Sequence, residues 1–109
     1  MAEPLAYSLS TWIIKSGQSD AFVKMWKDIA NYITQNSKGV IDFTLMQDAD
    51  QSNVFFSFGR WENSDVLNIW SESPEFESFM NKIKPLIDDV KMSTLKGVFS
   101  IKGNISLTS

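Results

Sequence analysis

Residues 53–79 constrain the fold of this chain more than any other stretch, because an aromatic-rich strand runs directly into two short helices with clear start signals. Aromatic and β-branched side chains suit a pleated, half-buried surface, and here they are Val54, Phe55, Phe56, Phe58 and Trp61. Polar residues then end the strand, and Asn63 or Ser64 can cap a helix in which Leu67 and Trp70 share one face.

The second helix of this stretch has an equally clear beginning. Ser73 is a suitable N-cap residue, and Pro74 follows it at the first helical position. Apolar residues then recur at helical spacing, at Phe76, Phe79, Met80 and Ile83. We expect Pro85 to interrupt the helix near Lys84.

The chain before this stretch predicts two strands and a long helix. Residues 7–14 alternate as a strand, with Tyr7, Leu9, Thr11 and Ile13 on one face and Ser8, Ser10, Trp12 and Ile14 on the other. An apolar stripe predicts a helix that ends near Asn36, followed by a strand over residues 40–47. The polar turn at residues 48–53 is short enough for a β-hairpin.

A last strand is expected around residues 93–101, with Leu95, Gly97, Phe99 and Ile101 on one face. The resulting element order predicts an α+β fold of the ferredoxin-like split βαβ type, a four-stranded antiparallel sheet with helices on one face. Since the strands are apolar on both sides, we expect the open sheet face to be covered by an identical subunit in a homodimer.

Length and charge limit the classes of function. With 109 residues, 43% of them hydrophobic, the chain is expected to form one domain over residues 1–109, with a core at about 5–102 and a polar C-terminal tail. The net charge is −3 and no basic run stands out, so nucleic acid is an unexpected partner. No apolar run approaches the roughly 20 residues of a membrane span, and we expect a cytoplasmic protein without membrane attachment.

The chain contains neither cysteine nor histidine. Their absence removes thiolate nucleophiles, the most frequent general base and the most frequent metal and heme ligand. We therefore expect no metal site and no bound cofactor.

The chain resembles the antibiotic biosynthesis monooxygenase (ABM) family of the dimeric α/β-barrel superfamily over roughly residues 5–102. The resemblance rests on WIIKSGQSDAFVKMW near the N-terminus, on FSFGRWE, and on the pattern that runs from Trp61 through Trp70 to SPEF. It implies a cofactor-independent monooxygenase that oxidises an electron-rich aromatic or quinone-like molecule with O₂. A non-catalytic small-molecule-binding protein or a structural dimer is the alternative.

A heme-degrading branch of the family implies a third function. It uses an asparagine, a tryptophan and an iron-ligating histidine, which fall near Ser10, at Trp70 and at Met80 of this chain. Methionine alone is a poor ligand for heme iron, so this function is disfavoured.

The resemblance and the strand pattern together suggest a small apolar pocket. The residues expected to line it are Ser10, Trp12, Phe58, Arg60, Trp70 and Met80. No catalytic residue is identified, and the candidates are Trp70, Asp42 and Tyr7. Asp42 could accept a proton if it lines a cavity, but it is simply exposed if its strand is an edge, which we favour. Each tryptophan could equally be ordinary core packing.

Overall fold

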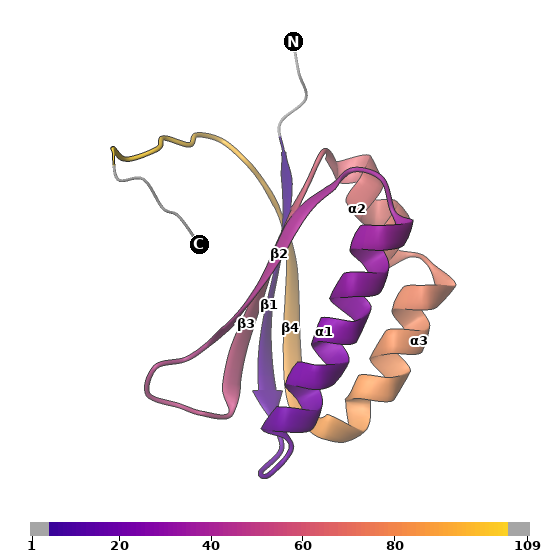
Figure 1. The fold of residues 1–109 in the computed structure, drawn as a ribbon, viewed down its shortest axis with the longest axis vertical. Coiled ribbons are helices and arrows are strands. Elements are labelled where there is room, and N and C mark those ends of the chain that lie inside the picture. The colour runs from indigo at the N-terminus through magenta and orange to yellow at the C-terminus, as the bar shows by residue number, and fades with distance from the viewer. Residues whose placement is uncertain (1–4, 105–109) are drawn as a thin grey trace.

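The computed structural model describes residues 5–104. The strands are β1 (Ala6–Ile14), β2 (Val40–Gln47), β3 (Val54–Trp61) and β4 (Ile87–Lys96). The helices are α1 (Ser19–Asn36), α2 (Ser64–Ser71) and α3 (Pro74–Ile83), with a 3₁₀ turn at Lys84–Leu86. All neighbouring strands are antiparallel in the order β2-β3-β1-β4, and Figure 1 shows the helices on one side of the sheet. The predicted α+β ferredoxin-like fold is confirmed.

The two short helices begin where their sequence signals indicate. The Asn63 side chain accepts a 3.1 Å hydrogen bond from the Val66 N–H, so Asn63, not Ser64, caps α2. Ser73 Oγ accepts from the Phe76 N–H at 3.1 Å, and Pro74 is the first residue of α3. Local hydrogen bonds therefore set both helix starts.

The last strand was predicted too late in the chain. β4 pairs with β1 from Ile14 opposite Ile87 to Ala6 opposite Lys96, which fixes its ends at residues 87 and 96. The pairing is irregular at Asp88, which has no partner in the register. Because the strand begins with this irregularity and with two aspartates, its first residues do not show the alternation of polar and apolar residues that indicates a strand. Beyond Gly97 the chain leaves the sheet, so Phe99 and Ile101 do not belong to a strand.

The core consists of two clusters between the sheet and the helices. One contains Trp12, Ile14, Phe22, Phe55, Phe79 and Ile83, and the other contains Ala6, Ile33, Trp61 and Leu67. Aromatic rings in the first cluster contact one another at tilted and edge-on angles, which adds to the stabilisation that burial gives.

The opposite side of the sheet, here called the open face, has no helix against it. Its apolar side chains are those of Tyr7, Leu9 and Ile13 of β1, Met46 of β2, Phe56 and Phe58 of β3, and Leu95 of β4. The same face carries the polar residues Thr11, Asp42, Thr44, Arg60, Lys91 and Ser93. Met46 and Leu95 are 44% and 43% exposed. The two faces of β1 and β3 therefore follow the predicted alternation, and both are largely apolar.

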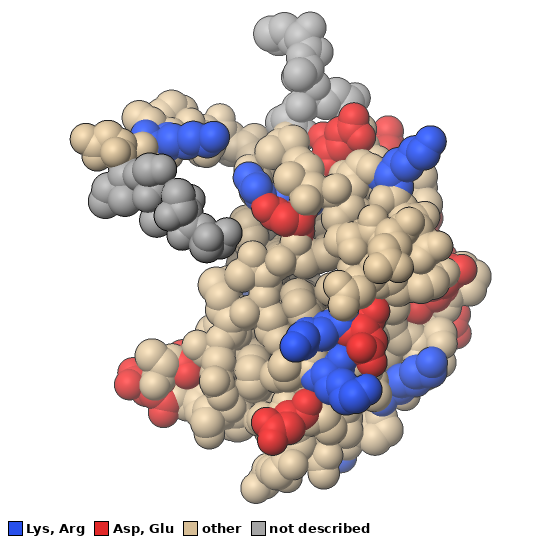
Figure 2. Space-filling view, in the orientation of Figure 1, with Lys and Arg blue, Asp and Glu red and all other residues tan. Residues whose placement is uncertain are grey.

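The helical side of the surface carries mixed charge. Lys, Arg, Asp and Glu side chains are interspersed over the face seen in Figure 2, without a block of one sign. No helix within residues 5–104 combines the length and hydropathy of a membrane span.

Candidate functional site

Small residues interrupt the core in the middle of the sheet. On the helical face, two successive cross-strand pairs are Ser8 with Gly59 and Ser10 with Ser57, separated by a pair that points to the open face. The rungs on either side carry the large side chains of the two core clusters, Trp61 at one end and Trp12 with Phe55 at the other. These four positions form a floor of small residues, which leaves room above the sheet.

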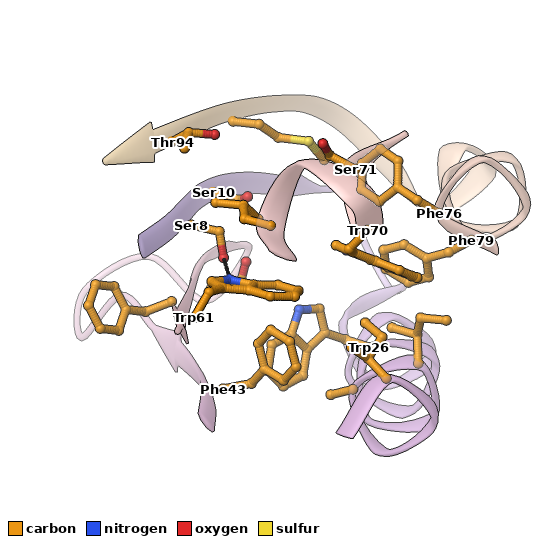
Figure 3. Close-up of a pocket in the computed structure, with 18 of the residues that line it drawn as sticks. Ser8, Ser10, Trp26, Phe43, Trp61, Trp70, Ser71, Phe76, Phe79 and Thr94 are labelled. Atoms are coloured by element: carbon orange, nitrogen blue, oxygen red, sulfur yellow. Dashed lines mark hydrogen bonds between the residues drawn. The ribbon is translucent and has the colours of Figure 1, made fainter. Parts of the chain in front are cut away.

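The room above this floor is a cavity of about 160 Å³. Its walls are mainly aromatic, and Figure 3 shows the rings arranged around it: Trp26, Phe43, Trp61, Trp70, Phe76 and Phe79. They come from α1, β2, β3, α2 and α3, so the whole helical layer contributes to the enclosure. Such a site suits a flat apolar ligand with few polar groups.

Two of the floor serines are already engaged by tryptophans. Trp61 Nε1 donates to Ser8 Oγ at 3.0 Å, and Trp12 Nε1 donates to Ser57 Oγ at 2.9 Å. The two indoles are 1% and 2% exposed, so these hydrogen bonds satisfy donors that water cannot reach. The bonds also hold both rings against the floor.

Ser10 differs from the other floor serines. Its residue is only 9% exposed, and no described residue forms a side-chain hydrogen bond with its hydroxyl. Among the described residues, no fully buried side-chain oxygen or nitrogen lacks a partner, so Ser10 Oγ must retain access to the cavity. The hydroxyl can therefore donate to, or accept from, a bound molecule.

The cavity opens between α2 and β4. The lining residues with exposed side chains are Ser71, at the end of α2, and Met92 and Thr94 of β4. Figure 3 places Ser71 and Thr94 together at one side of the cavity, away from Trp26 and Phe43.

Arg60, Asp42 and Tyr7 were predicted site residues, but they lie on the open face and are not part of the cavity lining. Arg60 donates from Nε to Asp42 Oδ1 at 2.9 Å and from Nη2 to Asp42 Oδ2, and both side chains are about half exposed. The hydrogen bond from Arg60 lowers the pKa of Asp42, assisted by charge attraction and opposed by partial burial. Tyr7 lies opposite Arg60 in the register. β2 is an edge strand of the sheet, which is the arrangement in which Asp42 was expected to be exposed and not to line a cavity.

The predicted pocket residues differ in whether they line the cavity. Ser10, Trp12 and Trp70 line the cavity. Phe58 borders it, but its ring centroid is 5.4 Å from that of Tyr7 on the open face, which leaves only the backbone to face the cavity. Met80 is not part of the lining, because it packs against the core cluster around Trp12. Arg60 is outside the lining because it projects from the opposite face of the sheet.

The residues present do not fit heme. Met80, at the position that corresponds to the ligand histidine, is packed in the core. The cavity volume of about 160 Å³ is also below the roughly 300 Å³ of the smallest usual pockets for drug-sized ligands. Residues 5–104 contain no cluster of three or more Asp, Glu, His or Cys side chains suited to a metal ion.

Several lining residues were not foreseen as site residues, chiefly Trp26, Phe43, Trp61 and Gly59. The available signal was the alternation of β1, which places Ser8 and Ser10 on the face that carries Trp12. Small residues on the core side of a central strand indicate unfilled space. Which helix would supply the walls depends on tertiary packing.

Comparison with known proteins supports the fold and places the chain in a family. The model of the antibiotic biosynthesis monooxygenase family matches residues 9–82, and the chain belongs to this family. A search of curated proteins found no match.

Solved structures show the same fold at low sequence identity. SnoaB, a cofactor-independent oxygenase from Streptomyces nogalater solved as the N63A mutant, is 13% identical with a TM-score of 0.82, over 92% of this chain and 99% of SnoaB. PA3566 from Pseudomonas aeruginosa is 20% identical with a TM-score of 0.73, over 91% and 98% of the two chains. A conserved protein from Methanosarcina mazei is 14% identical with a TM-score of 0.76, over 85% and 92%.

Proposed function

We propose that this protein is a cofactor-independent oxygenase of a compact, electron-rich aromatic or quinone-like compound. The observation that carries the proposal is the aromatic-walled cavity into which the buried Ser10 hydroxyl faces without a side-chain hydrogen bond to any described residue. Membership of the ABM family supports the reaction class. SnoaB, a cofactor-independent oxygenase, has the same fold.

The cavity volume supports a small substrate. An apolar cavity of about 150 Å³ in another protein holds a benzene molecule, and the cavity here is about 160 Å³. The proposed substrate therefore has one aromatic ring with small substituents. A compound of three or four fused rings would require the helices to move.

The proposed reaction follows from the substrate's own acidity. A phenol loses its proton to water, and the phenolate binds with its oxygen accepting from Ser10 Oγ. The ring carbon para to this oxygen forms a C–O bond with O₂, and uptake of one proton gives a hydroperoxide. The hydroperoxide then loses water: the para carbon gives up its hydrogen, the O–O bond breaks, and the remaining oxygen becomes the second carbonyl of a quinone. One phenol and one O₂ thus give one quinone and one water, and a desolvated hydrogen-bond donor at the phenolate aids the charged state.

One observation favours the second candidate function, binding without turnover. None of the lining residues is an Asp, Glu, Lys, Arg or Tyr, so the cavity contains no titratable side chain that could remove a proton. In that case the protein would sequester the same class of aromatic molecule. The chemistry of the ligand is shared by the two proposals, but oxygen consumption is not.

Two measurements on the same samples separate these functions. An oxygen electrode measures O₂ consumption with a panel of single-ring phenols and hydroquinones, while isothermal titration calorimetry measures binding. The oxygenase proposal expects turnover that Ser10→Ala together with Trp70→Phe abolishes, with the fold retained. Thr11→Val is the control, because Thr11 lies on the same strand but faces away from the cavity. Binding without turnover supports the second function. The absence of both binding and turnover refutes both functions.

We also propose that the protein is a homodimer in which two open faces pack together. The support is the set of apolar side chains on this face, among them Met46 and Leu95, which would otherwise remain in contact with water. Sedimentation equilibrium tests the proposal, and a monomer at micromolar concentration would contradict it.

A further inference from the structure

The edge strand β4 completes the floor of the cavity with one long side chain. Its pairing with β1 places Met92 directly opposite Ser10 and Thr94 directly opposite Ser8, so both residues of β4 share the helical face with the serines. Across β3, β1 and β4 this gives two rows of residues: Ser57, Ser10 and Met92 in one, and Gly59, Ser8 and Thr94 in the other. Met92 is the only one of these six with a long side chain.

Met92 also lies where the cavity meets water. It is 41% exposed, whereas its cross-strand neighbour Ser10 is 9% exposed. The cavity opens between α2 and β4, and Ser71 and Thr94, which Figure 3 labels at this side, are the other exposed residues of the lining. The thioether side chain of Met92 therefore belongs both to the lining and to the mouth of the cavity.

The side chain at the mouth differs in stiffness from the aromatic walls. Trp70 and Phe76 pack edge to face, with ring centroids 5.5 Å apart and an interplanar angle of 81°, which holds both rings in place. Methionine is unbranched and flexible, and its polarisable sulfur makes favourable contacts with aromatic rings. A methionine at this position can lie against one bound ring, but it occupies the space into which a second fused ring would extend.

We infer that Met92 is a specificity-determining residue of the cavity, because its side chain limits the bound molecule to one aromatic ring. The inference rests on the proposed binding of an aromatic compound beside Ser10 and deepens that proposal. Cβ atoms of residues directly opposite on antiparallel strands are about 4.5–5.5 Å apart, so a ring whose oxygen is bound at Ser10 lies within reach of the Met92 sulfur. Shortening Met92 opens space beside the ring toward water, and a second ring fits there without movement of the helices.

The first test compares phenol with 2-naphthol, which differs from phenol by one fused ring. Binding is measured by calorimetry under argon, so that no O₂ is consumed. The wild-type protein should bind phenol more tightly, although the larger apolar surface of 2-naphthol favours it in an unrestricted site. Met92→Ala should shift the ratio of the two dissociation constants about tenfold toward 2-naphthol. Met92→Leu retains the side-chain volume and should keep the wild-type preference.

Met46→Ala is the matched control. Met46 is 44% exposed, close to the value for Met92, but it lies on β2 and faces away from the cavity. Its substitution should leave the affinities for phenol and 2-naphthol unchanged. An equal shift in Met46→Ala and Met92→Ala would mean that the change does not arise at the mouth, which overturns the inference.

The remaining outcomes separate this inference from the proposed function. If the wild-type protein binds phenol and Met92→Ala keeps the wild-type preference, Met92 does not set the size limit, but the proposed site stands. The same conclusion follows if Met92→Leu accepts 2-naphthol as readily as Met92→Ala does. A wild-type protein that binds neither compound overturns both the inference and the proposed function.

A second test needs no substitution. Hydrogen peroxide transfers one oxygen atom to a methionine sulfur, which gives the sulfoxide and water, and peptide mass spectrometry measures the extent at each methionine. Saturating phenol should slow sulfoxide formation at Met92 several-fold, because the bound ring covers the sulfur, and should leave the rate at Met46 unchanged. If phenol binds but Met92 is oxidised at the same rate with and without it, the ring does not contact this side chain and the inference is wrong.

Discussion

Filling the cavity should make this protein more stable and at the same time unable to bind its ligand. Atoms that line an unfilled space lack the packing contacts that a side chain would make, and the space here is about 160 Å³. Ser10 is the position from which to fill it, because its side chain faces the cavity and no described residue hydrogen-bonds its hydroxyl.

The substitution Ser10→Leu replaces a hydroxyl with three carbon atoms. At about 0.8 kcal/mol for each buried methylene, the free energy of unfolding should rise by about 2 kcal/mol, measured by urea denaturation. Binding of a single-ring phenol, measured by calorimetry, should weaken at least tenfold because the ligand and the leucine compete for the same space. Ser10→Ala separates volume from hydrogen bonding: stability should change little, and phenol binding should weaken several-fold.

Two results would refute this reasoning. If Ser10→Leu binds the phenol as tightly as the wild-type protein, the cavity is not the binding site. If Ser10→Leu is destabilised by more than 2 kcal/mol while Ser10→Ala is neutral, the space above the floor is too small for the added carbons. Thr11→Leu, on the opposite face of β1, serves as the control and should leave phenol binding unchanged.

Three further substitutions test the surroundings of the cavity and the open face. Ser8→Ala leaves the buried indole N–H of Trp61 without its 3.0 Å acceptor and should lower the free energy of unfolding by about 1–3 kcal/mol, measured in urea. Gly59→Ala should cost about 1–3 kcal/mol by the same measurement, because the new Cβ would lie 2.6 Å from Ser8 Oγ. Asp42→Asn should be less stable than wild type near pH 7. Because Arg60 lowers the folded-state pKa of Asp42, this difference is present above the unfolded pKa of about 4 and is lost as the pH falls through the folded value.

These predictions have clear contrary outcomes. Gly103→Ala is the control for Gly59→Ala, because a Cβ there meets no atom within 4 Å, and equal effects at the two glycines would contradict the packing argument. For Asp42→Asn, urea midpoints measured from pH 2 to pH 7 should converge with those of wild type at the acid end. A stability difference that stays constant over this range would exclude the ion pair as its cause, and added salt should reduce the difference.

The parts of the fold that depend on local chemistry were predictable from the sequence. The cap at Ser73, the cap expected at Asn63 or Ser64 and the interruption at Pro85 depend on residues a few positions apart. The structure confirms Ser73 and the interruption and shows that Asn63 is the cap of α2. The last strand was misplaced because its ends are set by pairing with β1, about 80 residues earlier in the chain, and not by its own alternation.

The candidate site was harder to predict for a related reason. The alternation in β3 separates Arg60 from Trp61, and following it strictly would have put Arg60 on the open face with Phe56 and Phe58. The floor of small residues is a property of two strands paired in one register, since Ser8 and Gly59 are far apart in the sequence. The walls could not be predicted, because a tryptophan beside a cavity and one in a filled core have the same helical or strand spacing.

The arrangement of the aromatic walls gives this protein an optical property of its own. The chain has four tryptophans, Trp12, Trp26, Trp61 and Trp70, and all of them line the cavity. The tryptophan fluorescence of the native protein therefore originates entirely from residues that border one small space. A quinone bound among these indoles should quench the emission of the whole chain, with no unaffected background from a distant tryptophan. The unmodified protein is thus its own spectroscopic reporter of occupancy.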